Sequence, residues 1–373
     1  MKNSMWSAVL VMTVILVGAA QAGDDFKTYG KLHMSLEMLN NSEDSQPTVS
    51  NNGSRFGLKG AREMNDKFKM IWQFEQKINL AQKGSETLAT RNSYLGLAGE
   101  WGTALFGIHD TPFKTMGSKV TFFRDEIGDY RQAAFNWDRR LQDVVLYITP
   151  NYDGISGRVM FEIDQGAMGA EEAKSIISGS ASYKKEGLYL GVAYEMLSKA
   201  FAYSAWTDTT DAAAHVVNNV YGNSAQGIRA GAKYQMDKLG FSAIFQTLSD
   251  YNQGSFSVNE FDEGIAVEND KKAMTYGAEA EFQFAQKYST KAGYYLADPN
   301  TDVDDDEFSL LAVGLDHQFS KDLWFYLQYA MVMNGDASEA ALGCTYNGHG
   351  KIVEASGPGQ NPSGFSLGMA MKF

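Results

Sequence analysis

The chain is poor in cysteine and in proline, and both shortages restrict what it can be. Cys344 is the single cysteine among 373 residues, so no disulfide can form within the chain and no cluster of thiolates can hold a metal ion. Proline cannot donate a hydrogen bond to a β-ladder, which makes its position informative. The six prolines all fall between or at the ends of strand-like runs, at positions 47, 112, 150, 299, 358 and 362. This placement leaves long ladders uninterrupted.

Basic residues are also in short supply. The chain has 32 Lys and Arg against 45 Asp and Glu, which gives a formal net charge of −13. Proteins that bind nucleic acid need a basic surface, so this balance argues against nucleic acid as a partner.

Long apolar runs are confined to the N-terminus. Lys2 precedes an apolar run from Val9 to Ala20, and small residues lead up to Gly23. This pattern predicts a secretory signal peptide over residues 1–22 and a mature domain over residues 23–373. After it, no apolar run reaches the length of about eighteen residues that a transmembrane helix requires.

What the chain has in abundance is strict alternation of apolar residues with small or polar ones, over runs of about ten residues. At the C-terminus one face carries Phe365, Leu367, Met369, Met371 and Phe373, and the other carries Gly364, Ser366, Gly368, Ala370 and Lys372. Sixteen such runs predict sixteen strands, at 26–39, 53–62, 67–80, 91–98, 102–109, 141–149, 157–164, 177–184, 188–197, 227–236, 240–248, 273–284, 288–297, 308–319, 322–333 and 363–373.

The connections between these runs alternate in length. Short turns are expected at 62–67, 99–102, 150–157, 184–187, 236–240, 286–287 and 320–322, and long ones at 40–52, 81–90, 110–140, 165–176, 198–226, 249–272, 298–307 and 334–362. Outer-membrane barrels have short turns at one end and long loops at the other. A soluble sandwich has no reason to keep this alternation, and a solenoid would need a repeat of fixed period, which is absent.

We therefore predict an all-β fold, a 16-stranded antiparallel transmembrane β-barrel. Lipid offers no hydrogen-bond partner to backbone amides, so only a closed ladder is stable there. The apolar faces must then point outward, and the small and polar faces must line a wet interior. The alternative interpretation is a large secreted β-sandwich.

One connection is unlike the others. The stretch from His109 to Arg140 carries charges of both signs together with six aromatic residues, Phe113, Phe122, Phe123, Tyr130, Phe135 and Trp137. We expect this third long connection to fold into the mouth of the barrel, where the aromatic side chains find a surface to cover. The alternative is an ordinary surface loop that packs on its own aromatic residues.

Several motifs resemble the general-diffusion porins of Gram-negative bacteria, of the betaproteobacterial and neisserial type. They are YGKLHMSLE at 29–37, SRFGLKG at 54–60, NSYLGLAGEWGTALFGIHDTPF at 92–113, RDEIGDYR at 124–131, RLQDVVLYITPNYDGISG at 140–157 and the C-terminal Phe373. The resemblance spans the mature chain. It implies an outer-membrane channel for passive diffusion of ions and small hydrophilic solutes, with no cofactor and no metal. It also implies a homotrimer embedded in the bilayer beside lipopolysaccharide, whose assembly machinery recognises the strand ending in Phe373.

The resemblance further implies a constriction lined by charge. Its basic wall would contain Arg55, Arg91 and Arg140, and Lys59 shares the inward parity of Arg55 on the same strand. The parity of Arg91 is outward, so it would have to lie at the rim or beside a bulge. Acids of the inward loop would face this wall: Asp110, Asp125, Glu126 and Asp129. Each of these charges could instead be a solvated or ion-paired loop residue.

Two features leave the selectivity open. The family usually has an Arg at the position of Ile108, and its absence weakens the basic cluster. The acidic run from Asp298 to Glu307 could bind divalent cations between lipopolysaccharide molecules, or it could be only a solvated, repelling loop. It has no central glycine and no closing glutamate at the offsets that a calcium loop requires.

An outer-membrane hydrolase and a non-conducting adhesin are the rival functions. The sequence contains no HExxH motif, and His33 and His317 share the inward parity that a pore wall would explain. An open lumen would favour a pore, whereas a plugged one would favour an adhesin.

Overall fold

The computed structural model describes residues 25–82, 91–135, 137–163, 175–198, 225–249, 272–301, 303–343 and 349–373. The predicted signal peptide, residues 1–22, and Cys344 lie outside these residues.

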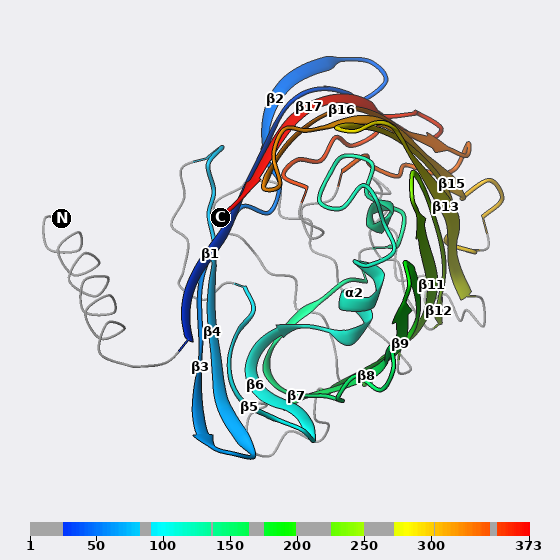
Figure 1. Ribbon diagram of the computed structural model, residues 1–373. Coiled ribbons are helices and arrows are strands. Elements are labelled where there is room, and N and C mark those ends of the chain that lie inside the picture. The colour runs from blue at the N-terminus through cyan, green and yellow to red at the C-terminus, as the bar shows by residue number, and fades with distance from the viewer. Residues whose placement is uncertain are drawn as a thin grey trace, which may run out of the picture.

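The described chain forms one antiparallel sheet that closes into a barrel (Figure 1), because the first strand pairs with the last one as well as with the strands that follow it. The strands are β1 Asp25–Asn40, β2 Ser45–Asn51, β3 Arg55–Asn65, β4 Phe68–Lys77, β5 Ser93–Gly99, β6 Gly102–Asp110, β7 Arg140–Ile148, β8 Ile155–Glu162, β9 Ile176–Lys185, β10 Leu188–Leu197, β11 Ala225–Met236, β12 Leu239–Ser249, β13 Lys272–Ala285, β14 Tyr288–Asp298, β15 Phe308–Gln318, β16 Leu323–Asn334 and β17 Ser363–Lys372.

Strands β2 and β3 are two halves of one barrel strand, so the barrel has the sixteen strands that the sequence predicts. The first half of β1, from Asp25 to Lys31, pairs with β3, and the second half, from Met34, pairs with β2. The break between them lies at residues 52–54, where Gly53 adopts a φ of 72°. Glycine reaches this left-handed conformation without strain.

One predicted loop is wrong. Residues 40–52 were expected to form a long connection, but the connection spans only residues 41–44, and β2 begins at Ser45. Asn41 makes this turn tight, because its side chain accepts hydrogen bonds from the backbone N–H groups of Glu43 and Asp44. Pro47 therefore lies inside a strand. Among the described strands β2 is paired only with β1, and proline is tolerated at such an unpaired edge.

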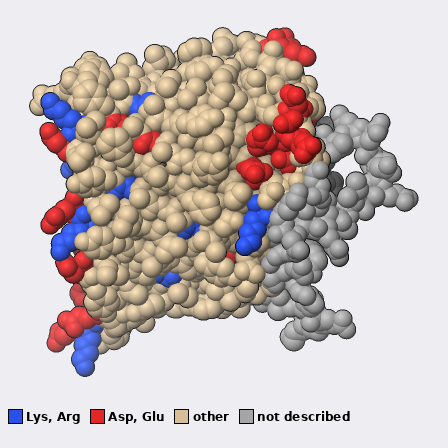
Figure 2. All heavy atoms as spheres, turned by 90° about the vertical axis from the view of Figure 1, so that its right-hand side faces the viewer, with Lys and Arg blue, Asp and Glu red and all other residues tan. Residues whose placement is uncertain are grey.

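The two faces of the barrel are sorted as a membrane requires. On β1 and β17 the outward side chains are apolar, and Leu36 and Phe365 are 61% and 59% exposed. The inward neighbours Ser35, Glu37 and Ser366 are buried. In the space-filling view a broad band with few charged side chains separates charges gathered at the two edges (Figure 2). None of the described helices is long and apolar enough to span a membrane.

Aromatic side chains on the outer surface cluster at the short-turn end, where a membrane interface would lie. Trp101 stacks on Tyr147 with ring centroids 6.3 Å apart, and the Tyr147 hydroxyl donates to the Trp101 carbonyl. Tyr288 lies against His317 with ring centroids 4.4 Å apart and ring planes tilted by 30°. The inward parity expected for His317 is wrong, because on β15 the inward residue is its neighbour Asp316, which pairs with a buried lysine.

The core of the molecule lies inside the barrel, where residues 111–139, which we call the inner segment, pack against inward side chains of the strands (Figure 1). Its helix α2, Pro112–Gly117, begins at Thr111, whose side chain accepts from the backbone N–H of Lys114. The helix packs against β9, β10 and β11. A short 3-10 helix, Tyr130–Gln132, follows. The segment therefore packs on the wall with its aromatic residues, and the surface-loop alternative does not describe it.

Glycines on the wall make room for this packing. A Cβ placed on Gly191 of β10 would lie 2.7 Å from Cγ of Met116, and one on Gly231 of β11 would lie 3.0 Å from both methyl groups of Val120. We expect Gly191→Leu to destabilise the barrel by about 1–3 kcal/mol through overpacking. Urea unfolding in detergent, followed by tryptophan fluorescence, measures this.

The control for this substitution is Val192→Leu, which enlarges the neighbouring side chain on the lipid-facing surface, where Val192 is 48% exposed. It should leave the unfolding midpoint unchanged. Equal urea unfolding midpoints for the two variants would show that the inner segment is not tightly packed against β10 at Gly191.

Candidate functional site

Two cavities occupy the interior of the barrel on opposite sides of the inner segment. The first, of about 480 Å³, opens toward the long connections, and we call it the loop-side chamber. Its charged lining consists of Lys77, Arg91, Lys114, Lys119, Arg124, Arg131, Arg140, Arg158 and Lys351, against only Asp110 and Asp125. The second, of about 550 Å³, opens toward the short turns and is the turn-side chamber. Its charged lining is Lys31, Arg55, Arg124, Lys287, Lys291, Lys321 and Lys372, against Asp125, Glu126, Glu281 and Asp316.

Glu75 on β4 brings two of the predicted arginines together. Its carboxylate lies 2.6 Å from Nε of Arg91 and 3.6 Å from Nε of Arg55, and it accepts a hydrogen bond of 3.0 Å from the hydroxyl of Tyr29. Arg91 precedes β5, and its backbone N–H donates to the Glu75 carbonyl. Strand parity therefore does not govern its direction, and it reaches the lumen.

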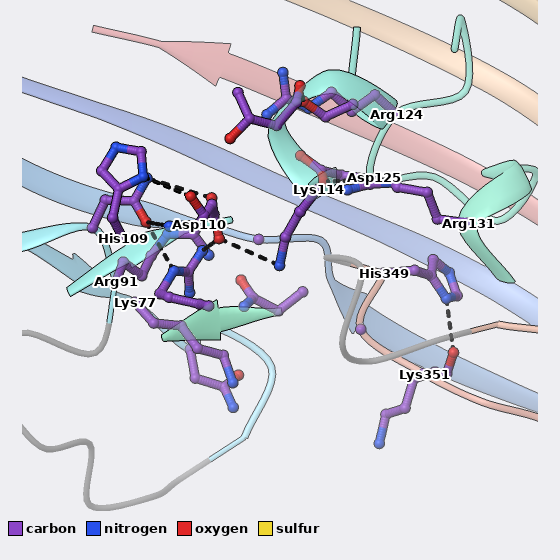
Figure 3. Close-up of a pocket in the computed structure, with 18 of the residues that line it drawn as sticks. Lys77, Arg91, His109, Asp110, Lys114, Arg124, Asp125, Arg131, His349 and Lys351 are labelled. Atoms are coloured by element: carbon purple, nitrogen blue, oxygen red, sulfur yellow. Dashed lines mark hydrogen bonds and ion pairs between the residues drawn. The ribbon is translucent and has the colours of Figure 1, made fainter. Parts of the chain in front are cut away.

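Arg140, at the start of β7, forms a second cluster. Its Nη2 lies 2.9 Å from Asp110, and its Nε donates to the side chain of Asn92 at 3.0 Å. Lys114 approaches Asp110 from the inner segment at 3.4 Å (Figure 3). Asp110 was expected to face the basic wall from across the opening. It belongs to that wall instead, because β6 ends beside the first residue of β7.

Lys59 is on the inner surface but apart from both clusters. Its Nζ lies 5.0 Å from the centre of the Tyr29 ring, and it lines neither chamber. The alternation of β3 correctly predicts its direction, whereas its height in the barrel separates it from the other basic residues.

The remaining predicted acids attach the inner segment to the wall. Asp125 lies 3.0 Å from Lys31 of β1 and 3.1 Å from Arg131, which also binds Asp129. Glu126 lies 2.7 Å from Lys291 of β14. All three carboxylates are buried, and only Asp125 and Glu126 border a chamber.

Burial and pairing act differently on these acids. Burial favours the neutral form of Asp125, but Lys31, Arg124 and Arg131 outweigh it and hold its pKa well below the usual range. Burial raises the pKa of Glu126 to about 7, against the opposing effect of Lys291. The negative charge of Asp125 and of Glu126 is thus offset by the basic residues beside each carboxylate.

Two lumen residues have roles that the sequence analysis missed. Arg158 on β8 lines the loop-side chamber, and the alternation of Ile155, Val159 and Phe161 on the outer face would have placed it inward. Arg124 lines both chambers, and no periodic signal marks it because it lies in irregular chain.

His349 fastens the last long connection to the wall. Its Nε2 lies 2.8 Å from Glu37 and its Nδ1 lies 2.7 Å from the carbonyl oxygen of Lys351. Both partners are acceptors, so both ring nitrogens must carry a proton. Burial alone would lower the pKa of His349, but Glu37, the Lys351 carbonyl and Asp129 raise it above its usual value, while His33 faces the same cluster from β1.

This contact makes stability depend on pH. Because the pKa of His349 is raised in the folded state, its contact with Glu37 contributes fully to folding stability below about pH 6.5. This contribution is lost as the pH rises through the folded pKa. Removing the contact should cost about 1.5–3 kcal/mol, the value of a hydrogen bond to a charged group. We expect the thermal midpoint of the wild type to fall between pH 6 and 9. The midpoint of His349→Gln should be lower and should change little over this range, so the two midpoints should converge as the pH rises. Parallel curves for the two proteins would contradict this assignment.

No group of three or more His, Cys, Asp or Glu is placed to hold a metal ion among the described residues.

Comparisons with known proteins agree with this architecture. The model of the Gram-negative porin family matches residues 7–337. The major outer membrane protein P.IA of Neisseria meningitidis serogroup C is 23% identical over 362 residues, covering 83% of this chain and 87% of the relative. The outer membrane protein YedS of Escherichia coli is 22% identical over 358 residues, covering 90% and 94%.

Solved structures show the same fold. The anion-selective porin from Comamonas acidovorans superposes with a TM-score of 0.73 at 19% identity, covering 94% of this chain and all of that one. The trimer form of OmpT from Vibrio cholerae gives a TM-score of 0.65 at 15% identity, covering 94% and 99%.

Proposed function

The chain belongs to the Gram-negative porin family, and we propose that its pore favours small hydrophilic anions. As a porin it is an outer-membrane channel through which small solutes diffuse, and it is not an enzyme. The sign of its selectivity is the part that we propose.

The observation that carries this proposal is the charge of the loop-side chamber, where nine basic side chains face two carboxylates. A narrow passage lined by one sign of charge concentrates ions of the opposite sign. The printed name of the Comamonas acidovorans porin describes it as anion-selective, which supports the same sign here. Ile108 occupies the position where the family usually has an arginine. In this chain Arg158 and Arg124 supply positive charge to the lumen instead.

We assign the basic side of the constriction to Arg55, Arg91 and Arg140, which two carboxylates, Glu75 and Asp110, gather on one wall. The acids of the inner segment serve as anchors in this proposal, and Asp125 is the one that borders both chambers. Lys59 acts below the constriction. Each acid described in the inner segment is paired with a basic residue, so the basic wall faces no unpaired carboxylate of that segment.

We further propose that residues 1–22 direct export and are removed, and that the strand ending in Phe373 is recognised during assembly of the barrel. Phe373 closes the seam of the barrel, because its carbonyl accepts from the N–H of Gly30 at 2.9 Å. Three copies would associate in the bilayer beside lipopolysaccharide, as the trimer form of the Vibrio cholerae OmpT structure supports.

The experiment is the reversal potential in a planar bilayer under a salt gradient. We expect the wild type to prefer anions, and Arg55→Gln combined with Arg140→Gln to lower that preference. A unit charge about 8 Å from the ion path in water is worth about 0.5 kcal/mol, so each lost charge should reduce the permeability ratio by about twofold.

The control is Asp304→Asn, which removes a charge from the exposed connection between β14 and β15. It should leave the reversal potential unchanged. A cation-preferring wild type, or equal shifts from all these changes, would refute the assignment of selectivity to the wall.

A further inference from the structure

Arg124 occupies a position that no other basic residue shares among the described part of the chain. Its side chain is exposed and borders both chambers. It forms no hydrogen bond or ion pair with any described residue. Figure 3 shows it on the inner segment beside Asp125. A guanidinium without a partner, at the junction of two cavities, is available to a solute that passes from one to the other.

The backbone around Arg124 is fixed. The flanking side chains of Phe123 and Asp125 are buried, Phe123 completely. Three residues before Arg124, Thr121 donates to Glu279 at 2.7 Å, and two residues after it, Glu126 binds Lys291 at 2.7 Å. Arg124 therefore projects from a segment that is held on both sides, so little ordering is needed when it binds a ligand.

The wall supplies a second guanidinium. Arg55 and Arg124 both line the turn-side chamber, so two guanidinium groups border the same space. The Nη1 of Arg55 donates to the Gly53 carbonyl at 3.2 Å and its Nε faces Glu75. Its Nη2 has no partner among the described residues.

The local balance of charge is positive by two. The connected cations are Lys31, Arg55, Arg91, Arg124, Arg131 and Arg229, and the carboxylates paired with members of this set are Glu75, Asp125, Asp129 and Asp138. Six cations against four carboxylates leave a net excess of two positive charges.

We propose that Arg124 and Arg55 form the two sides of a binding site for small oxyanions with two negative charges, at the junction of the two chambers. The proposal rests on the anion pathway described above and names the solute class that it retains. Guanidinium groups present N–H donors in a plane that matches the oxygens of a sulfate, phosphate or dicarboxylate. A divalent anion neutralises the excess charge, whereas a monovalent one leaves half of it.

The experiment compares sulfate with perchlorate, which are both tetrahedral oxyanions and differ in charge. Chloride current through single channels is measured at pH 7 while either anion is added. Sulfate should reduce the chloride current in a saturable manner in the wild type, and perchlorate should do so much more weakly. In Arg124→Gln the sulfate concentration for half reduction should rise about tenfold or more, since a charged hydrogen-bond pair is lost.

Arg158→Gln is the matched control, because it removes the same charge from the loop-side chamber away from the junction. It should shift the reversal potential but leave half reduction by sulfate within about twofold of the wild type. Arg124→Lys keeps the charge and loses the planar fork, so its sulfate response should lie between those of wild type and Arg124→Gln. Heat-modifiability on a gel verifies that each variant is folded.

The two proposals fail in different ways. An anion-preferring wild type without saturable reduction by sulfate would refute the binding site and leave the anion pathway standing. Equal loss of the sulfate response in Arg124→Gln and Arg158→Gln would also refute it, because the effect would then be a diffuse field. A cation-preferring wild type would refute the anion pathway itself.

Discussion

Backbone hydrogen bonding in lipid is the constraint on which this structure depends. A strand edge left open in the bilayer would expose amide and carbonyl groups that have no other partner, at a cost of several kcal/mol for each group. β1 removes the edge by pairing with β17 along Lys31 to Asn40 and with β2 and β3 on its other side. Closure in turn forces alternate side chains into the interior, and those of β1 include Lys31, His33 and Glu37.

A closed barrel with a polar interior creates the next requirement, which is to neutralise the charges that point inward. The inner segment meets it by placing carboxylates against wall cations, as in the contacts of Asp125 with Lys31 and of Glu126 with Lys291. Arg229 of β11 is completely buried and is held by Asp138 at 2.6 Å. Breaking one partner of such a pair leaves a buried charge, which is far more costly than losing a surface ion pair. The anchors therefore fix the position of the segment across the lumen.

Much of this could be predicted from the sequence, because the strand period of two is a local property. The sixteen strands and the outward apolar face follow from alternation alone, and the direction of Lys59 does too. The second strand was predicted too short because Ser45–Asn51 has no apolar alternation, and its pairing with β1 depends on a turn made by the side chain of Asn41. Which long loop enters the barrel was recognisable from its aromatic residues, which need a surface to cover.

Charge pairing could not be predicted in this way, because it is decided by contacts between residues far apart in the sequence. Asp110 and Arg140 are thirty residues apart and meet because β6 and β7 are neighbours. The loop acids look like an opposing row in the sequence, yet each is paired with a cation, and the side chain left facing the passage is Arg124. For the same reason the total charge of −13 gives no indication of the lumen, where basic residues exceed acids. What a passing ion meets is set by the charges that folding leaves unpaired.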